Sequence, residues 1–144
     1  MQSELNAAYP GLKINILGIN QFDLASANAE ATSGRSLPWL QDVDANNDGQ
    51  SDVWNAWGAT WRDVVIVDGQ NRRVATYNVT SNNLATEANY ATLRDMILDA
   101  AFADQRPWCN WRNPYDANHD GAITELDAHC LIQQLNSFGA DLLA

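Results

Sequence analysis

The chain has 144 residues, enough for one domain with a buried core, and its 46% hydrophobic residues and six tryptophans indicate a folded globule. Its formal net charge is −10, from 18 acidic and 8 basic residues. This balance argues against nucleic acid and anionic membranes as partners, because both are bound through Lys and Arg, and no apolar run is long enough for membrane insertion.

The N-terminal part of the chain predicts four elements before a clear hairpin. The first is the end of a helix, which a Pro–Gly pair terminates. β-branched residues in the second favour a strand. The third is small and polar, so a weak helix and a loop both fit. The fourth has Trp54 and Trp57 at helical spacing and Gly58 as its expected end. In order, these elements cover residues 1–9, 12–20, 21–36 and 53–57.

An antiparallel hairpin is the clearest element in the sequence. Two β-rich runs, Val64–Val67 and Val74–Val79, flank a turn of Asp68, Gly69, Gln70 and Asn71. Asp, Gly and Asn are typical turn residues, and such a short connection requires antiparallel pairing.

Two helices are predicted after the hairpin. The first lies within residues 80–103 and begins near Thr86; its apolar face holds Tyr90, Leu93, Ile97 and Ala101. Residues 104–115 contain two prolines and no period, which favours a linker or packed joint. The second helix covers residues 125–138, and one of its faces holds Leu126, Cys130 (or His129), Ile132 and Leu135.

These elements predict an α/β fold class. A partial sheet of strand, helix, antiparallel hairpin and helix is followed by a small α calcium-hand. The expected domains are residues 1–104, with an acidic loop inserted at 42–55, and residues 105–144, comprising the linker, a second acidic loop and the last helix.

The second acidic loop, "DANHDGAITELD", fills every position of the EF-hand calcium pattern. Calcium prefers six to eight oxygen ligands from a tightly curled loop, with glycine at position six. Gly121 holds that position, and Ile123 at position eight is the expected apolar anchor. Three carboxylates in one turn would repel each other without a cation, although a metal-free Asx-rich turn is the alternative. The ligand candidates are Asp116, Asn118, Asp120, Ala122 (through its carbonyl), Thr124 and Asp127.

The first acidic loop, "DANNDGQSDVWN", matches the pattern less completely. Position twelve is Asn55, which has no bidentate carboxylate, so we expect Asp52 to replace it and Asp42 to add nearby charge. A solvated turn is again the alternative. The ligand candidates are Asp44, Asn46, Asp48, Gln50 (through its carbonyl) and Asp52. The sequence therefore predicts one calcium ion in the second loop and a further one in the first.

The stretch "NPYDANHDGAITELDAHCLIQQLN" resembles one half of a dockerin, a calcium-loop module of secreted and surface proteins. The resemblance covers about 25 residues. It implies calcium binding, and a protein partner that docks through the C-terminal helix.

Residues 5–103 resemble the later part of a thioredoxin-like (redoxin) domain, through "ILGIN" and "VWNAWGATWRDVVIVDGQNRRVATYN". The resemblance implies a sheet flanked by helices. Redox members carry Cys-x-x-C after their first strand, and this chain has neither that strand nor that motif. A shortened or divergent thiol-disulfide oxidoreductase is therefore the enzymatic alternative, with no catalytic residues assigned.

The remaining candidate residues favour structural roles. Cys109 and Cys130 are too few to define a disulfide framework; they could pair, or remain thiols. His119 and His129 have no neighbours that suggest a catalytic triad. Trp54, Trp57 and Trp61 could stack on sugars, but packing in the core is the preferred interpretation.

The sequence thus predicts a calcium-binding, redoxin-like protein whose fold is stabilised by the ion. The resemblances place it outside the cell, in the periplasm or at the cell surface, although the start of the chain shows no signal peptide. The alternatives are the oxidoreductase and a calcium-dependent interaction module.

Overall fold

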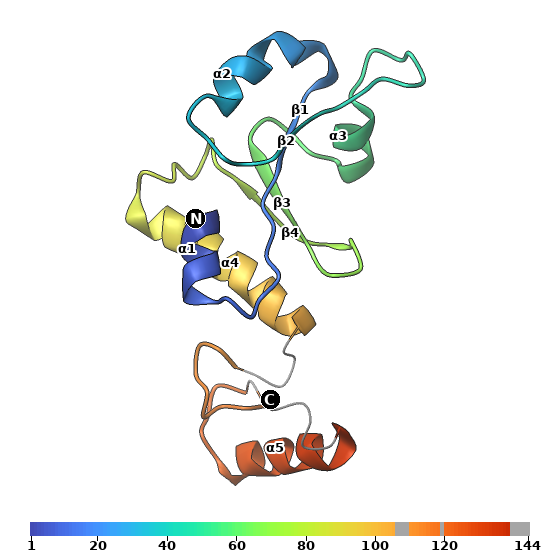
Figure 1. Ribbon diagram of the computed structural model, residues 1–144. Helices are drawn as coiled ribbons and strands as arrows, with labels where there is room; N and C mark the ends of the chain where they lie inside the picture. Colours follow the sequence, from blue (N-terminus) through green and yellow to red (C-terminus); the bar gives the residue numbers. More distant parts are fainter. Residues whose placement is uncertain (106–109, 119, 139–144) are drawn as a thin grey trace.

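A computed structural model describes residues 1–105, 110–118 and 120–138. Figure 1 shows the helices and strands coloured along the chain, with the last helix, Glu125–Phe138, set apart beyond the end of the long helix Glu87–Gln105. The elements are α1 (Gln2–Ala8), β1 (Gly18–Asn20), the 3-10 helix η1 (Phe22–Ala27), α2 (Asn28–Thr32), β2 (Trp39–Gln41), α3 (Asp52–Trp57), β3 (Asp63–Val67), β4 (Arg73–Asn78), α4 (Glu87–Gln105) and α5 (Glu125–Phe138).

The described strands form two separate pairs. β1 and β2 are parallel, with Ile19 opposite Leu40, whereas β3 and β4 are antiparallel, with Val65 opposite Thr76. The fold is therefore mixed α/β, with a short parallel pair and an antiparallel hairpin. The thioredoxin-like arrangement of these strands stays a prediction.

The hairpin confirms the clearest expectation from the sequence. Its turn is held by Asp68, whose Oδ1 accepts the N–H groups of Gln70 and Arg72 at 2.9 Å each. The side chain of Arg72 also donates to this carboxylate, and these bonds lower the pKa of Asp68. Asn71 has a φ of 59°, a left-handed conformation that Asn tolerates better than most residues.

The hydrophobic core lies between α4, the hairpin and the N-terminal segment (Figure 1). α4 supplies most of it, from residues three or four apart, as expected for an amphipathic helix. Tyr90 of the predicted face is only half-buried, because its hydroxyl bonds the side chain of Glu4 at the surface. The buried residues of this core are Leu5, Leu12, Ile66, Leu93, Ile97, Leu98, Ala101 and Phe102.

The strand predicted for residues 12–20 is correct only at its end. β1 covers Gly18–Asn20, and the preceding residues bond side chains instead of a neighbouring strand. Gln2 accepts from the N–H of Ile16 at 2.6 Å and donates to the carbonyl of Ile14 at 2.9 Å. The β-branched side chains still face the core, since Ile14 and Ile16 pack against it. The alternation therefore reported burial rather than sheet pairing.

The tryptophans near α3 depart from the expectation of core packing. Trp54 and Trp57 are half-buried, and Trp61 is 59% exposed. Trp54 donates its indole N–H to the carbonyl of Ile19 at 3.2 Å, and its ring lies 6.5 Å from that of Trp61. Gly58 ends α3 in a left-handed conformation with a φ of 57°, as predicted.

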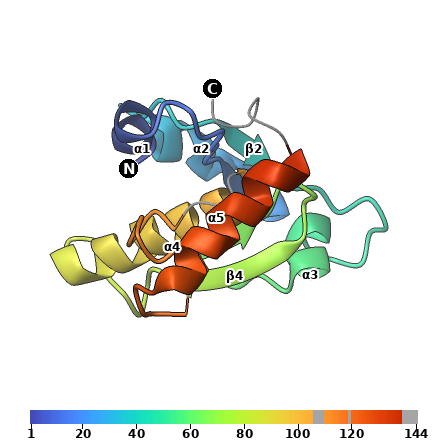
Figure 2. The same cartoon turned by 90° about the horizontal axis from the view of Figure 1, so that it is seen from below.

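The C-terminal helix α5 has the predicted bounds, Glu125–Phe138. Its apolar side chains are exposed: Leu126 by 59%, Leu131 by 43%, Ile132 by 53% and Leu135 by 40%. In the view from below, α5 lies in front of α4 (Figure 2). The domain boundary at 104 and 105 stays a prediction, although α4 itself continues to Gln105. No helix within the described ranges is long and apolar enough to cross a membrane.

Candidate metal centres

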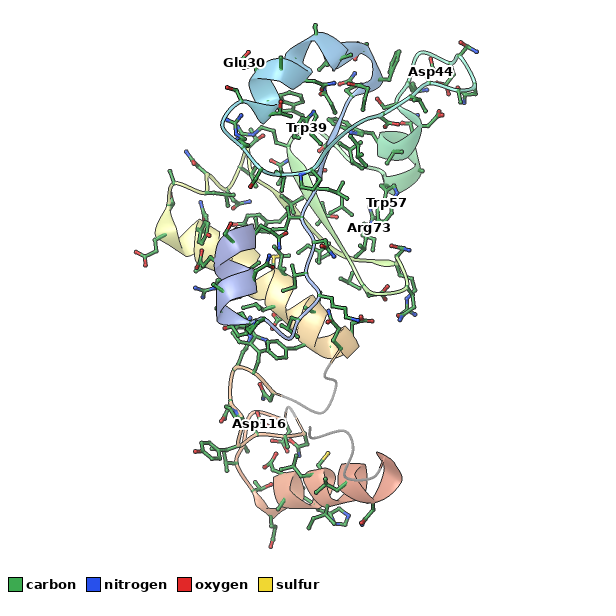
Figure 3. All side chains as sticks on the ribbon, viewed as in Figure 1. Glu30, Trp39, Asp44, Trp57, Arg73 and Asp116 are labelled. Carbon is green, nitrogen blue, oxygen red and sulfur yellow. The ribbon has the colours of Figure 1, made fainter. Side chains whose placement is uncertain are left out.

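The second acidic loop is folded around the side chain of Asp116, at position one (Figure 3). Asp116 is 4% exposed; its Oδ1 accepts the N–H of Asp120 at 3.1 Å, and its Oδ2 accepts the N–H of Gly121 at 3.1 Å. Asn118 accepts from the same Asp120 N–H at 3.0 Å and donates to the Asp120 carboxylate at 2.9 Å. Positions one, three and five are therefore drawn together, as the calcium pattern requires.

Asp127 closes this loop at position twelve. It is 4% exposed; Oδ1 accepts the N–H of Asn118 at 3.2 Å, and Oδ2 accepts the N–H of Thr124 at 2.7 Å. These bonds, with that of Thr124 first, lower the pKa of Asp127. Thr124 in turn accepts the N–H of Leu126 at 3.2 Å, which makes a reciprocal capping box at the start of α5.

The first acidic loop repeats the inner bonds of the second, position by position. Asp44 accepts the N–H groups of Asp48 at 3.0 Å and Gly49 at 2.9 Å, and Asn46 accepts from Asp48 at 3.1 Å. Asp48 then accepts the N–H of Gln50 at 2.9 Å, as Asp120 accepts that of Ala122. The two loops, 72 positions apart, thus share one pattern of hydrogen bonds among their described residues.

Glycine at position six permits the turn in both loops. Gly49 has a φ of 80° and Gly121 a φ of 85°, a region that residues with a side chain rarely adopt. A Cβ atom at either position would have no other atom within 4 Å, so the requirement comes from the backbone alone. This agrees with the turn that the sequence pattern predicts at these glycines.

The loops differ at the residue that closes them. In the first, Asp52 at position nine accepts the N–H of Ala45 at 3.0 Å, whereas Asn55 at position twelve donates to the side chain of Gln50 at 3.0 Å. α3 begins at position nine and α5 at position ten. The carboxylate that closes the first loop is therefore three positions earlier, where the sequence suggested a substitute.

Asp42, expected to add charge near the first loop, also has a structural role that the sequence did not predict. It is 3% exposed, and its carboxylate accepts the N–H groups of Val53 at 3.0 Å and Trp54 at 3.0 Å, in the first turn of α3. It also accepts the N–H of Val43 at 2.8 Å. Asp42 thus caps α3 across the loop, and its charge is directed to the helix N-terminus. Nothing in the local sequence signals a cap ten residues before its helix.

The second loop is tied to α4 by the segment just before it. Arg112 donates to Asp99 at 2.8 Å and pairs with Asp95 at 3.4 Å. Trp111 donates its indole N–H to Asp99 at 3.0 Å and stacks on the buried ring of Phe102. The bonds from Arg112, and then that from Trp111, lower the pKa of Asp99.

The two loops offer oxygen atoms for a hard cation. Carboxylate, amide and backbone carbonyl oxygens are the ligands that calcium prefers. Among the described residues, no three His, Cys, Asp or Glu side chains are grouped so that they could hold a metal ion by themselves. Any ion would therefore depend on amide and carbonyl oxygens as well. A self-bonded Asx turn remains the alternative for both loops, because every inner carboxylate already accepts N–H groups.

The other candidate residues are only partly placed by the structure. Cys130 is half-buried on α5, and His129 bonds the side chain of Gln133 at 2.9 Å. Cys109 and His119 lie outside the described residues, so the pairing of the two cysteines stays a prediction.

Comparison with protein-family models, with curated proteins and with solved structures gives no match for this chain. The resemblances to dockerins and to thioredoxin-like domains therefore rest on the sequence motifs alone.

Proposed function

We propose that this protein binds calcium in its two acidic loops, and that the ion stabilises the fold of a redoxin-like domain at the cell surface or outside the cell. One observation carries the proposal. The first and second loops make the same hydrogen bonds at positions one, three, five, six and seven, although the chain around them differs. In an EF-hand loop the ligands come from positions one, three, five and seven, with glycine at position six.

The proposed mechanism is the linkage of binding to folding. Each loop carries three candidate carboxylate ligands within a short stretch of the chain, and their charges repel one another when no cation is present. A bound ion reverses the sign of that interaction in the folded state only. Folding is then favoured by RT ln(1 + [Ca]/Kd), about 2.7 kcal/mol at a hundredfold excess over the dissociation constant.

The second loop is the stronger of the two proposed sites. Its outer carboxylates, Asp116 and Asp127, are each 4% exposed and already oriented, so few side-chain rotamers remain to be fixed by the ion. In the first loop Asp44, the counterpart of Asp116, is only half-buried, and position twelve holds an amide. Extracellular modules bind calcium at about 10⁻⁴–10⁻³ M, which suits the proposed location.

A melt of the purified chain in excess calcium and in EDTA tests the proposal. We expect a higher melting temperature in calcium, and we expect Asp116→Ala and Asp120→Ala to remove most of the difference. Both substitutions also break hydrogen bonds within the loop. The readout is therefore the difference between the two conditions for each variant, rather than its melting temperature.

Asp23→Ala is the matched control, because it removes one exposed acidic charge outside both loops. It should leave the calcium-dependent difference unchanged. Identical melts of the unmodified chain in calcium and in EDTA would end the proposal.

A second candidate function is a calcium-dependent interaction module that uses α5. The observation in its favour is the exposed apolar stripe of Ala128, Leu131, Ile132 and Leu135, at the spacing of one helix face. Capture of a partner that needs both calcium and Leu131 would favour it. The oxidoreductase alternative depends on Cys109, and no described contact favours it.

A further inference from the structure

The end of α3 and the hairpin border a shallow hollow of about 350 Å³, open to solvent, that lies outside both acidic loops. Figure 3 labels Trp57 and Arg73 at this place, where the last turn of α3 meets the start of β4. The volume is at the lower end of that of small-molecule sites, and because most lining residues are exposed, a ligand here would be only partly buried. The lining residues are Ala56, Trp57, Gly58, Asn71 and Arg73.

Arg73 is held in position at this hollow. Its Nη1 donates to the carbonyl of Trp57 at 2.6 Å, and it therefore satisfies one of the free acceptors at the C-terminus of α3. Within the described ranges Arg73 takes part in none of the ion pairs, which use Arg72, Arg94 and Arg112. A guanidinium that donates from one nitrogen retains donors on its other nitrogens.

The other lining residues complement this cation. Trp57 is half-buried and contributes an indole, whose faces are apolar. Asn71 brings a carboxamide that can donate and accept, on a backbone with a φ of 59°. Gly58 adds no side chain, and a Cβ atom there would lie 3.7 Å from Nη1 of Arg73. The hollow therefore stays open beside the guanidinium.

From this arrangement we infer a binding site for a small organic carboxylate with a flat, apolar body. The carboxylate pairs with the free donors of Arg73, and the ring lies against the indole of Trp57. The net charge of −10 opposes anions at long range, so recognition depends on these short contacts. The site is independent of the proposed calcium loops. Titrations with the carboxylate in calcium and in EDTA should therefore give the same dissociation constant.

Titration of the ¹⁵N-labelled full chain with benzoate tests the site. We expect saturable shifts of the Trp57 indole N–H and the Arg73 Nε–H, with a dissociation constant of about 1 mM or tighter. Benzyl alcohol, a neutral analogue, should bind at least about tenfold more weakly, because it lacks the charge-assisted bonds. No saturable shift at about 10 mM benzoate, or equal binding of both probes, would overturn the inference.

Two arginine variants localise the effect. Arg73→Gln should weaken benzoate binding by about tenfold or more, whereas Arg72→Gln removes the same charge one residue away and should leave it unchanged. The site is contradicted if Arg73→Gln binds benzoate as tightly as the unmodified chain does, or if Arg72→Gln weakens binding as much as Arg73→Gln does. If Arg73→Gln destabilises the fold, Arg73→Lys takes its place: it keeps a charge and a donor for Trp57 but loses the planar fork, and unchanged affinity would likewise contradict the site.

Discussion

Trp111 stacks on Phe102, with ring centroids 5.8 Å apart and planes inclined by 11°. Phe102 belongs to the buried core of α4, and Trp111 precedes the second acidic loop by only a few residues. This contact, with the ion pairs of Arg112, joins that loop to the core. Loop and core should therefore influence each other's stability.

The stacked pair leads to a first prediction. Trp111→Ala should lower the free energy of unfolding by about 2 kcal/mol, because it removes a half-buried ring and its bond to Asp99. It should also reduce the effect of calcium on the melting temperature. Urea unfolding, followed by circular dichroism, measures the first effect. Trp61→Ala, at a ring that is 59% exposed, should lower the free energy of unfolding clearly less. Equal losses for the two variants would count against the coupling of the second loop to the core.

The cap on α3 gives a second prediction. Asp42→Ala should lower the free energy of unfolding by about 2 kcal/mol, because the partly buried N–H groups of Val53 and Trp54 lose their acceptor. Asp42→Asn keeps an acceptor without the charge and should cost less. Guanidinium unfolding of both variants provides the measurement. A neutral effect of Asp42→Ala would show that α3 does not need this cap.

Position twelve of the two loops gives a third prediction, which depends on the proposed calcium binding. Asn55→Asp should strengthen binding at the first loop by about tenfold, whereas Asp127→Asn should weaken binding at the second by a similar factor. Calorimetric titration of each variant measures both changes. Asp52→Asn is the comparison for the first loop. It removes the carboxylate that already closes this loop and should therefore weaken binding there. If Asn55→Asp leaves the affinity unchanged, that position does not reach the ion.

Asp99 gives a prediction about pH. Its folded-state pKa is lowered by Arg112 and Trp111, so the ionised form stabilises the fold. This contribution is complete above the unfolded pKa, about 3.9, and is lost as pH falls through the lower folded value. Because Asp99 is half exposed, we expect no more than about 1 kcal/mol. Asp99→Asn should flatten the acid limb of stability against pH, whereas Asp23→Asn should not; a carboxyl ¹³C titration reports the pKa directly.

Local pattern was sufficient to predict several elements. The hairpin followed from β-branched runs around a turn, and α5 followed from the apolar residues that recur on one face directly after the second acidic loop. The curl of both acidic loops also followed, because a carboxylate at position one and a glycine at position six determine it locally.

Contacts between distant residues account for what the sequence did not predict. The strand over residues 12–20 was wrong for most of its length because Gln2 and Gln105 bond that backbone. β2 has only three residues, too few for a visible period. The cap formed by Asp42 and the exposure of Trp61 depend on how α3 sits against its neighbours, which no local pattern records.

The inward-facing amides of the two loops have a consequence for hydrogen exchange. The N–H groups of Asp48 and Gly49 in the first loop, and of Asp120 and Gly121 in the second, lie at the surface but donate to carboxylates. Such protons exchange slowly only while their own loop stays closed. The two amides of each loop therefore report the opening of that loop separately, even when the rest of the chain remains folded.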